Sequence, residues 1–194
     1  MKSMMKDTVI LFVITLVAGL LLGGVYEITK EPIAVQKALR KTQAYQEVFS
    51  DAGSFETVEE MTGKGNADAT INEVAEAKDT SGNSLGYVMD ITTHGGYGGD
   101  IQFTMGIQND GTINGISILS IAETPGLGMK AEEVIKPQFA GKVSKGFWVT
   151  KTGAVTSDEI DAISGATVTS NAMVNGVNAG IDLFYSDLGG GTNE

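Results

Sequence analysis

The segment IQFTMGIQNDGTINGISILSI, residues 101–121, decides the fold. Residues 101–107 are rich in apolar side chains, and residues 113–121 are apolar at nearly every second position, which is typical of β-strands. Asn109-Asp110-Gly111 separates the two runs and is a strong hairpin signal, because tight turns favour Asn, Asp and Gly. The segment therefore predicts two antiparallel strands joined by a short turn.

Two more strands are expected before this hairpin and one after it. Residues 72–78 and 85–92 have strand-like patterns on either side of a polar turn, and residues 147–150 form a short run that holds the only Trp, Trp148. Strands that follow one another through tight turns pair in antiparallel order. An antiparallel sheet is therefore expected.

Helices are expected to cover this sheet. Residues 131–139 have helical character, and apolar residues recur at helical spacing from 173 to 184. Residues 169–183 therefore predict an amphipathic helix that packs on the sheet, with Thr169 or Ser170 as its N-cap. The fold class that follows is α+β, a twisted antiparallel sheet with helices packed on it.

An uncharged apolar run, residues 8–26, predicts a transmembrane helix. At ~1.5 Å per residue, a run of this length crosses the ~30 Å hydrocarbon layer. Lys2 and Lys6 precede the run, so residues 1–7 are expected in the cytoplasm and the rest of the chain outside, in a single-pass topology. A cleaved signal peptide is the alternative, but the run is longer than a typical signal-peptide core.

The remaining chain is divided into three parts. Residues 27–71 are interpreted as a membrane-proximal helix and linker, with the helix over 33–49 starting after Pro32. Residues 72–188 are expected to form one ligand-binding domain, and the Gly-rich residues 189–194 a flexible tail.

Composition excludes several kinds of function. The net charge of −11 argues against nucleic acid as a partner, because binding phosphates requires clusters of Lys and Arg. There is no Cys, which excludes disulfides, thiolate metal sites and cysteine-bound iron–sulfur clusters, and there is a single His. Any redox chemistry must therefore come from an organic cofactor or a carboxylate-bound ion.

Three Gly-marked loops interrupt the sheet pattern, at residues 94–99, 123–128 and 163–167. Glycine lets the backbone approach a ligand closely. Three such loops in one small domain indicate a shared binding mouth, although each alone is typical of an ordinary turn. None of them matches a P-loop or a dinucleotide-binding fingerprint.

The third loop continues DAISGAT, residues 161–167, into the last helix. Unpaired N–H groups and the helix dipole favour an anion at such a helix start. Thr167 would present its hydroxyl there, and the small residues Gly165 and Ala166 leave it room. The residues alone leave two interpretations open: Thr167 carries a phosphate group, or the hydroxyls here only cap the helix.

The loops also resemble a known family. DAISGAT resembles the flavinylation motif of the FMN-binding domain in the G subunit of Rnf-type ion-translocating ferredoxin:NAD oxidoreductases, a domain that also occurs in the C subunit of the sodium-translocating NADH:quinone oxidoreductase. ETPGLG at 123–128 resembles a second loop of the family without a mismatch, and GYGGDI at 96–101 resembles a third, with Asp100 where Pro is expected. The resemblance runs from residue 1 to about 188. In its length and its single membrane helix, the chain resembles the Rnf-type G subunit more than the longer C subunit of the quinone enzyme.

This resemblance implies FMN as the cofactor, joined through its phosphate to Thr167 by a flavin transferase. Tyr97 and Leu127 are expected against the flavin ring, with Glu123 and Thr124 hydrogen-bonding to the ring or the ribityl chain. For each of these residues, turn formation or core packing is the alternative. The other residues expected to bind the cofactor are Ser164, Gly165, Ala166, Gly126, Gly128, His94 and Gly98. Asp161 is expected either to serve the transferase or to cap a turn.

The implied function is electron transfer through the bound FMN within a cell-membrane complex that couples ferredoxin:NAD oxidoreduction to transport of Na⁺ or H⁺. The chain would be a redox subunit rather than a complete enzyme, and its implied partners are the other membrane and peripheral subunits and the flavin transferase. Two alternatives remain: the C subunit of the NADH:quinone enzyme, and a cofactor-free, membrane-anchored extracytoplasmic binding domain.

Overall fold

The structure, a computed structural model, describes residues 2–189, with side chains from Met4 onward. It contains two compact units, Met1–Arg40 and Lys41–Glu194, which are described separately. Of the expected flexible tail at 189–194, all but Gly189 lies outside the described residues.

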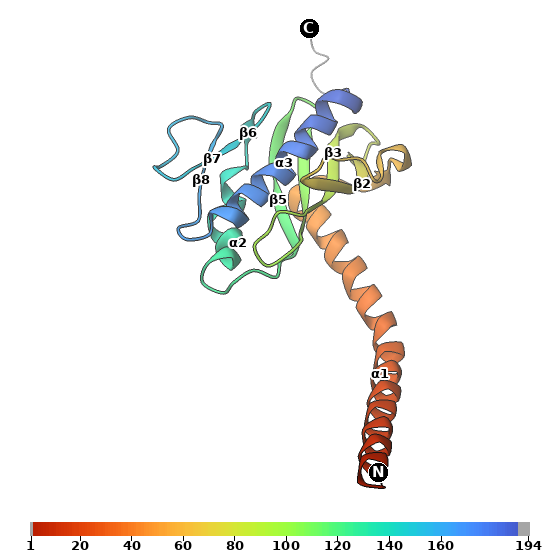
Figure 1. The fold of residues 1–194 in the computed structure, drawn as a ribbon. Helices are drawn as coiled ribbons and strands as arrows, with labels where there is room; N and C mark the ends of the chain where they lie inside the picture. The colour runs from red at the N-terminus through yellow and green to blue at the C-terminus, as the bar shows by residue number, and fades with distance from the viewer. Residues whose placement is uncertain (1, 190–194) are drawn as a thin grey trace. The chain divides into compact units, whose positions relative to one another are not determined.

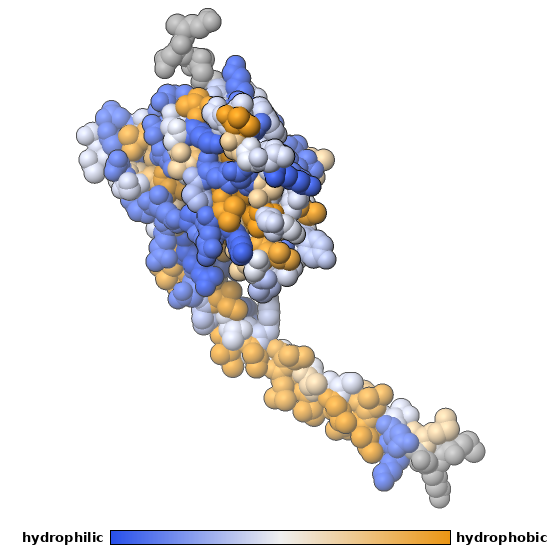
Figure 2. Space-filling view, turned by 90° about the vertical axis from the view of Figure 1, so that its left-hand side faces the viewer, coloured by the Kyte–Doolittle hydropathy of each residue, from blue (hydrophilic) through white to orange (hydrophobic). Residues whose placement is uncertain are grey.

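The first unit consists of helix α1, Lys2–Val48, as far as Arg40. Large apolar side chains along it, among them Leu11, Phe12 and Leu22, are exposed. Figure 2 shows them as a nearly continuous apolar surface along this helix. The helix is long and apolar enough to cross a membrane.

Pro32 was expected to start a second helix, but it lies inside α1. Proline lacks the N–H that would bond the carbonyl four residues earlier, which costs one helical hydrogen bond.

The second unit is built on a six-stranded sheet in which every strand pairs antiparallel with its neighbour in sequence (Figure 1). Its strands are β1 (Ser54–Thr57), β2 (Ala69–Lys78), β3 (Ser84–Thr93), β4 (Ile101–Gln108), β5 (Thr112–Ser120) and β6 (Lys142–Val143). The predicted hairpin is confirmed: the Gly111 N–H donates to the Gln108 carbonyl (2.9 Å) and the Thr112 N–H to the Asp110 carboxylate (2.8 Å).

A second, smaller sheet pairs β7 (Trp148–Thr150) with β8 (Glu159–Asp161) in parallel. The short strand predicted at residues 147–150 is confirmed as β7, and it pairs in this second sheet rather than in the six-stranded one. The loop between the two strands turns back on carboxylates of β8: Glu159 accepts from the Val155 N–H (2.5 Å) and Asp161 from the Ala154 N–H (2.7 Å). These bonds allow a parallel return within a short connection.

The predicted helix at 131–139 is mostly not α-helical. A 3₁₀ turn (η2, Gly128–Lys130) leads into the short α2 (Ala131–Val134), and a second 3₁₀ turn (η3, Lys136–Gln138) follows. Pro137 lies within η3 and cannot donate a helical hydrogen bond. One further 3₁₀ turn, η1 (Glu59–Met61), precedes β2.

Helix α3, Thr167–Asp187, lies across one face of the sheet (Figure 1). It packs on fully buried side chains of β3 and β4, including Ile91, Phe103 and Met105. Two glycines of α3 make the approach close: a Cβ on Gly176 would lie 2.8 Å from the Phe103 ring, and one on Gly180 would lie 2.5 Å from Met105 Cε. The α+β prediction is thereby confirmed.

The opposite face of the sheet has its own small core. Tyr45, Val48 and Phe49, from the end of α1 and the residue after it, pack on Ala75 and Val88 of the sheet. The last turns of α1 are therefore part of the folded domain.

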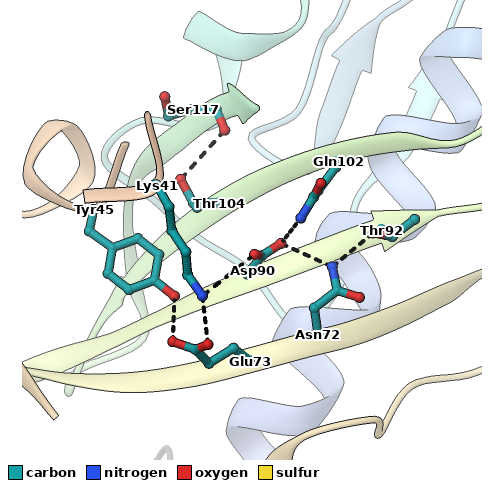
Figure 3. Close-up of polar contacts among 9 residues, drawn as sticks. All are labelled: Lys41, Tyr45, Asn72, Glu73, Asp90, Thr92, Gln102, Thr104 and Ser117. Carbon is teal, nitrogen blue, oxygen red and sulfur yellow. Dashed lines mark hydrogen bonds and ion pairs between the residues drawn. The ribbon is translucent and has the colours of Figure 1, made fainter. Parts of the chain in front are cut away.

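A polar network extends this second face (Figure 3). Asp90, only 4% exposed, accepts hydrogen bonds from Asn72 (3.0 Å) and Gln102 (2.8 Å). Lys41 donates to Glu73 (2.5 Å), which also accepts from the Tyr45 hydroxyl at 3.3 Å. Burial, together with the negative charges of Glu73 and Asp90, raises the pKa of Tyr45 far above its usual range. The network ties the end of α1 to β2 and β3.

Candidate functional site

The three Gly-marked loops meet at one cavity of about 520 Å³, a size typical of small-ligand sites. It is lined by Tyr97, Glu123, Thr124, Leu127, Gly128, Gly165, Ala166, Thr167, Val168 and Thr169. None of these ten residues is Lys or Arg, so the cavity wall has no basic side chain to bind an anion.

A tight turn forms the part of the cavity wall that leads into α3. The Ala166 N–H donates to the Ile163 carbonyl (2.9 Å), and Gly165 between them has φ +79°, which favours glycine. Fully buried Ser170 fastens this turn, because its hydroxyl accepts from the Ile163 N–H (3.0 Å) and donates to the Ala166 carbonyl (2.9 Å).

Helix α3 therefore begins two residues earlier than predicted, at Thr167, and the prediction of Thr169 or Ser170 as its N-cap is wrong. The N-cap position is Ala166, and no side chain caps the helix. Thr167 is the first helical residue and is half-buried at the cavity. The first N–H groups of a helix have no partner within it, so this end of α3 offers donors and a positive dipole end to an anion.

Asp161 and Gln138 position the strand that leads into this turn. The Asp161 carboxylate accepts from the Ala154 N–H, which is the turn-capping role expected for it as one of two alternatives. The Gln138 amide pairs with both backbone groups of Asp161: its oxygen accepts from the N–H (2.7 Å), and its nitrogen donates to the carbonyl (3.1 Å). The same nitrogen donates to the Val134 carbonyl (2.7 Å).

Glu123 forms the polar part of the second loop. It is only 6% exposed, and its Oε1 accepts from the Gly98 N–H at 3.2 Å. This bond ties the first Gly-marked loop to the second. Tyr97, at 75% exposed, and Leu127, at 42%, place apolar surface at the mouth. An apolar mouth above a few polar groups is suited to an aromatic ligand.

Of the twelve residues expected to bind the cofactor, eight line the cavity, and four do not: Ser164, Gly126, His94 and Gly98. His94 instead lies with Nε2 3.0 Å from the Thr70 hydroxyl and Nδ1 3.2 Å from Asp100. The Gly98 N–H donates to Glu123 Oε1, Gly126 occupies the turn of its loop at φ +78°, and Ser164 is exposed.

The structure adds Val168 and Thr169 to the expected lining residues. Their position follows from where α3 begins, because a helix that starts at Thr167 directs its first turn to the loop in front of it. If the helix had been predicted to begin at Thr167 instead of Thr169, both residues would have been expected at the cavity.

Comparison with known proteins finds relatives that match nearly the whole chain. The G subunit of the Na(+)-translocating ferredoxin:NAD(+) oxidoreductase complex of Acetobacterium woodii is 35% identical, over 95% of this chain and 93% of that protein. The G subunit of an ion-translocating oxidoreductase complex of Methanosarcina acetivorans is 32% identical, over 97% and 98%. The chain belongs to the family of G subunits of ion-translocating oxidoreductase complexes.

Two family models match separate parts of this chain. Residues 1–48 match the RnfG N-terminal region, and residues 96–182 match the FMN-binding domain. All ten cavity-lining residues fall inside the second range, whereas His94 falls outside it. The crystal structure of Shewanella oneidensis NqrC is also similar, with a TM-score of 0.49 and 21% identity over 71% of this chain and 70% of that one.

The cavity fits an FMN group on two observations. Thr169 Oγ1 is buried at its wall without a hydrogen-bond partner, the only such described side-chain atom. A Cβ on Gly128 would lie 2.6 Å from Glu123 Oε2, so glycine is required for this loop to pack against the carboxylate at the cavity wall. A cavity of about 520 Å³ with apolar surface at its mouth and a buried polar atom without a partner is suited to a flavin nucleotide.

Proposed function

We propose that this chain is the FMN-bearing redox subunit of a membrane-bound, ion-translocating oxidoreductase complex, with FMN joined through its phosphate to Thr167 Oγ1. The bound flavin supplies the electron-transfer chemistry, and the protein binds, orients and shields it. The observation that carries the proposal is the position of Thr167, a hydroxyl on the first residue of α3 at the wall of the cavity.

The site supports the tether through electrostatics. A phosphodiester at Thr167 would retain a negative charge, and no Lys or Arg lines the cavity to balance it. The start of α3 can, because its free N–H groups and dipole stabilise an anion within the first turn. A covalent bond also holds the cofactor in a site that is partly open.

The remaining lining residues have separate tasks. Tyr97 and Leu127 offer apolar surface to the isoalloxazine ring, while Glu123 and Thr124 offer hydrogen-bonding groups. Glu123 is positioned for this by the Gly98 N–H. Ser170 and Gln138 hold the turn that presents Thr167.

The assembly follows from the family. The relatives include proteins named for a Na(+)-translocating and for a proton-translocating complex, the latter from Clostridium ljungdahlii at 30% identity over 90% of this chain and 88% of that protein. Other subunits of such a complex and a flavin transferase are the proposed partners. The apolar part of α1 would anchor the chain, with residues 1–7 in the cytoplasm and the flavin domain outside, as Lys2 and Lys6 indicate.

Intact-mass measurement tests the tether. The full chain, produced together with its flavin transferase, should weigh the polypeptide plus one FMN less one water. Thr167→Ala should remove all of this added mass and the in-gel flavin fluorescence, whereas Thr169→Ala should keep both. Wild-type protein at the bare polypeptide mass would instead support a cofactor-free domain, and flavin retained in Thr167→Ala would place the tether on another oxygen.

A further inference from the structure

The Thr169 hydroxyl is an exception among the buried polar groups of this protein. Thr169 is 1% exposed, and its Oγ1 has no hydrogen-bond partner, unlike every other buried side-chain nitrogen or oxygen in the described part of the chain. A buried hydroxyl without a partner destabilises a fold, so such groups are rare and call for an explanation.

A threonine in a helix normally satisfies its hydroxyl locally. Thr15 and Thr29 of α1 do so, each donating to the carbonyl four residues earlier. Thr169 is too close to the start of α3 for this, because the residue four before it, Gly165, lies in the turn outside the helix. The next carbonyl, that of Ala166, already accepts from the hydroxyl and the N–H of Ser170.

Thr169 lies at the wall of the cavity that would hold the cofactor. Thr169 lines the cavity together with Glu123 and Gly128. A Cβ on Gly128 would lie 2.8 Å from Thr169 Oγ1 and 2.6 Å from Glu123 Oε2, so any side chain there would overlap both polar groups. Glu123 uses its other oxygen, Oε1, to bind the Gly98 N–H. Gly128 thus lets its loop pack closely against one hydroxyl and one carboxylate oxygen in the same corner of the cavity.

We propose that Thr169 Oγ1 donates a hydrogen bond to an oxygen of the FMN that Thr167 carries. The inference rests on the proposed function, and it assigns Thr169 a binding role distinct from that of the tether. Two hydroxyls of the first turn of α3 then divide the work: Thr167 holds the cofactor covalently, and Thr169 fixes its orientation.

Such a contact predicts that the effect of removing the hydroxyl depends on the cofactor. Thr169→Val keeps the shape of the side chain and removes the hydroxyl. In the flavin-loaded protein this change leaves a cofactor oxygen without its donor, and the melting temperature should fall by roughly 2–4 °C. In a flavin-free Thr167→Ala background the same change removes an unsatisfied group, and the melting temperature should stay the same or rise.

The experiment uses the full chain in detergent, produced with its flavin transferase, and compares melting temperatures with and without Thr169→Val in both backgrounds. Thr169→Ser, which keeps the hydroxyl, serves as the matched control and should restore the cofactor-dependent part of the stability. Intact mass is recorded for every sample, and Thr169→Val should remain fully flavinylated because the acceptor oxygen belongs to Thr167.

Each outcome decides between the two proposals. If the chain carries flavin and Thr169→Val shifts the melting temperature equally in both backgrounds, the Thr169 contact is overturned and the tether is unaffected. Wild-type protein that carries no flavin by mass would overturn both. A fall confined to the flavin-loaded protein, reversed by Thr169→Ser, establishes the contact, since a purely structural role would not depend on the cofactor.

Discussion

Gln138 lies outside the cavity, yet its replacement by Met should disturb the loop that carries Thr167. One side-chain amide makes three hydrogen bonds, two to the backbone of Asp161 and one to the Val134 carbonyl. At about 1 kcal/mol net for each bond, Gln138→Met should cost about 2–3 kcal/mol. Methionine has a similar length and fills the space, so little of this cost would come from a cavity.

For a chain of this size that loss corresponds to a fall in melting temperature of roughly 5–10 °C. The loss should also be measurable at the site itself. Hydrogen exchange at the Asp161 amide, whose acceptor is lost, should accelerate by about ten- to a hundredfold, because every ~1.4 kcal/mol corresponds to a factor of ten. Thermal denaturation and hydrogen exchange followed by mass spectrometry measure the two quantities.

Gln43→Met is the matched control, since Gln43 is exposed on the part of α1 that belongs to the same unit. It should leave the melting temperature within about 1 °C of wild type, as is usual for surface substitutions. The reasoning would be refuted if Gln138→Met matched this control in melting temperature and left the protection of the Asp161 amide unchanged.

Two further predictions concern the second face of the sheet. Asp90→Ala should cost about 2–3 kcal/mol in urea denaturation, because two amide donors lose a buried carboxylate, whereas the exposed Asp51→Ala should cost little; equal effects would contradict this. Burial raises the pKa of Glu47, but bonds to Lys136 and Ser117 outweigh it and set that pKa below its ordinary value. Its contribution to stability is therefore present above about pH 4.5 and lost as pH falls further, so Glu47→Gln should flatten this acid dependence of the melting temperature.

The central strands could be predicted because alternating side chains and the Asn109-Asp110-Gly111 turn specify a hairpin locally. Three short strands could not. Of β1, Phe55 is the only half-buried residue, and the strand forms because it pairs with β2. β6 has two residues and β8 three, too few for a periodic pattern. Such strands depend on partners distant in sequence.

The candidate site was predictable at the level of loops and less so at the level of atoms. Gly-marked loops indicate where backbone must bend or approach a ligand, and all three reach the cavity. His94 was expected there because it begins the first Gly-marked loop, but its ring lies beside Thr70 and Asp100. The free hydroxyl of Thr169 could not be foreseen, because it depends on which carbonyls the start of α3 leaves available.

The contribution of Tyr45, Val48 and Phe49 to the core of the sheet determines how the flavin domain can be separated from its anchor. A protease that cuts before Lys41 would release a fragment with both faces of the sheet covered. A fragment starting at residue 72, the boundary that the sequence indicated, would lack β1, the first residues of β2 and the three side chains that cover Val88. The helix that is long and apolar enough to cross a membrane thus also supplies residues to the folded domain, and the boundary between the two compact units lies within α1 rather than in a linker.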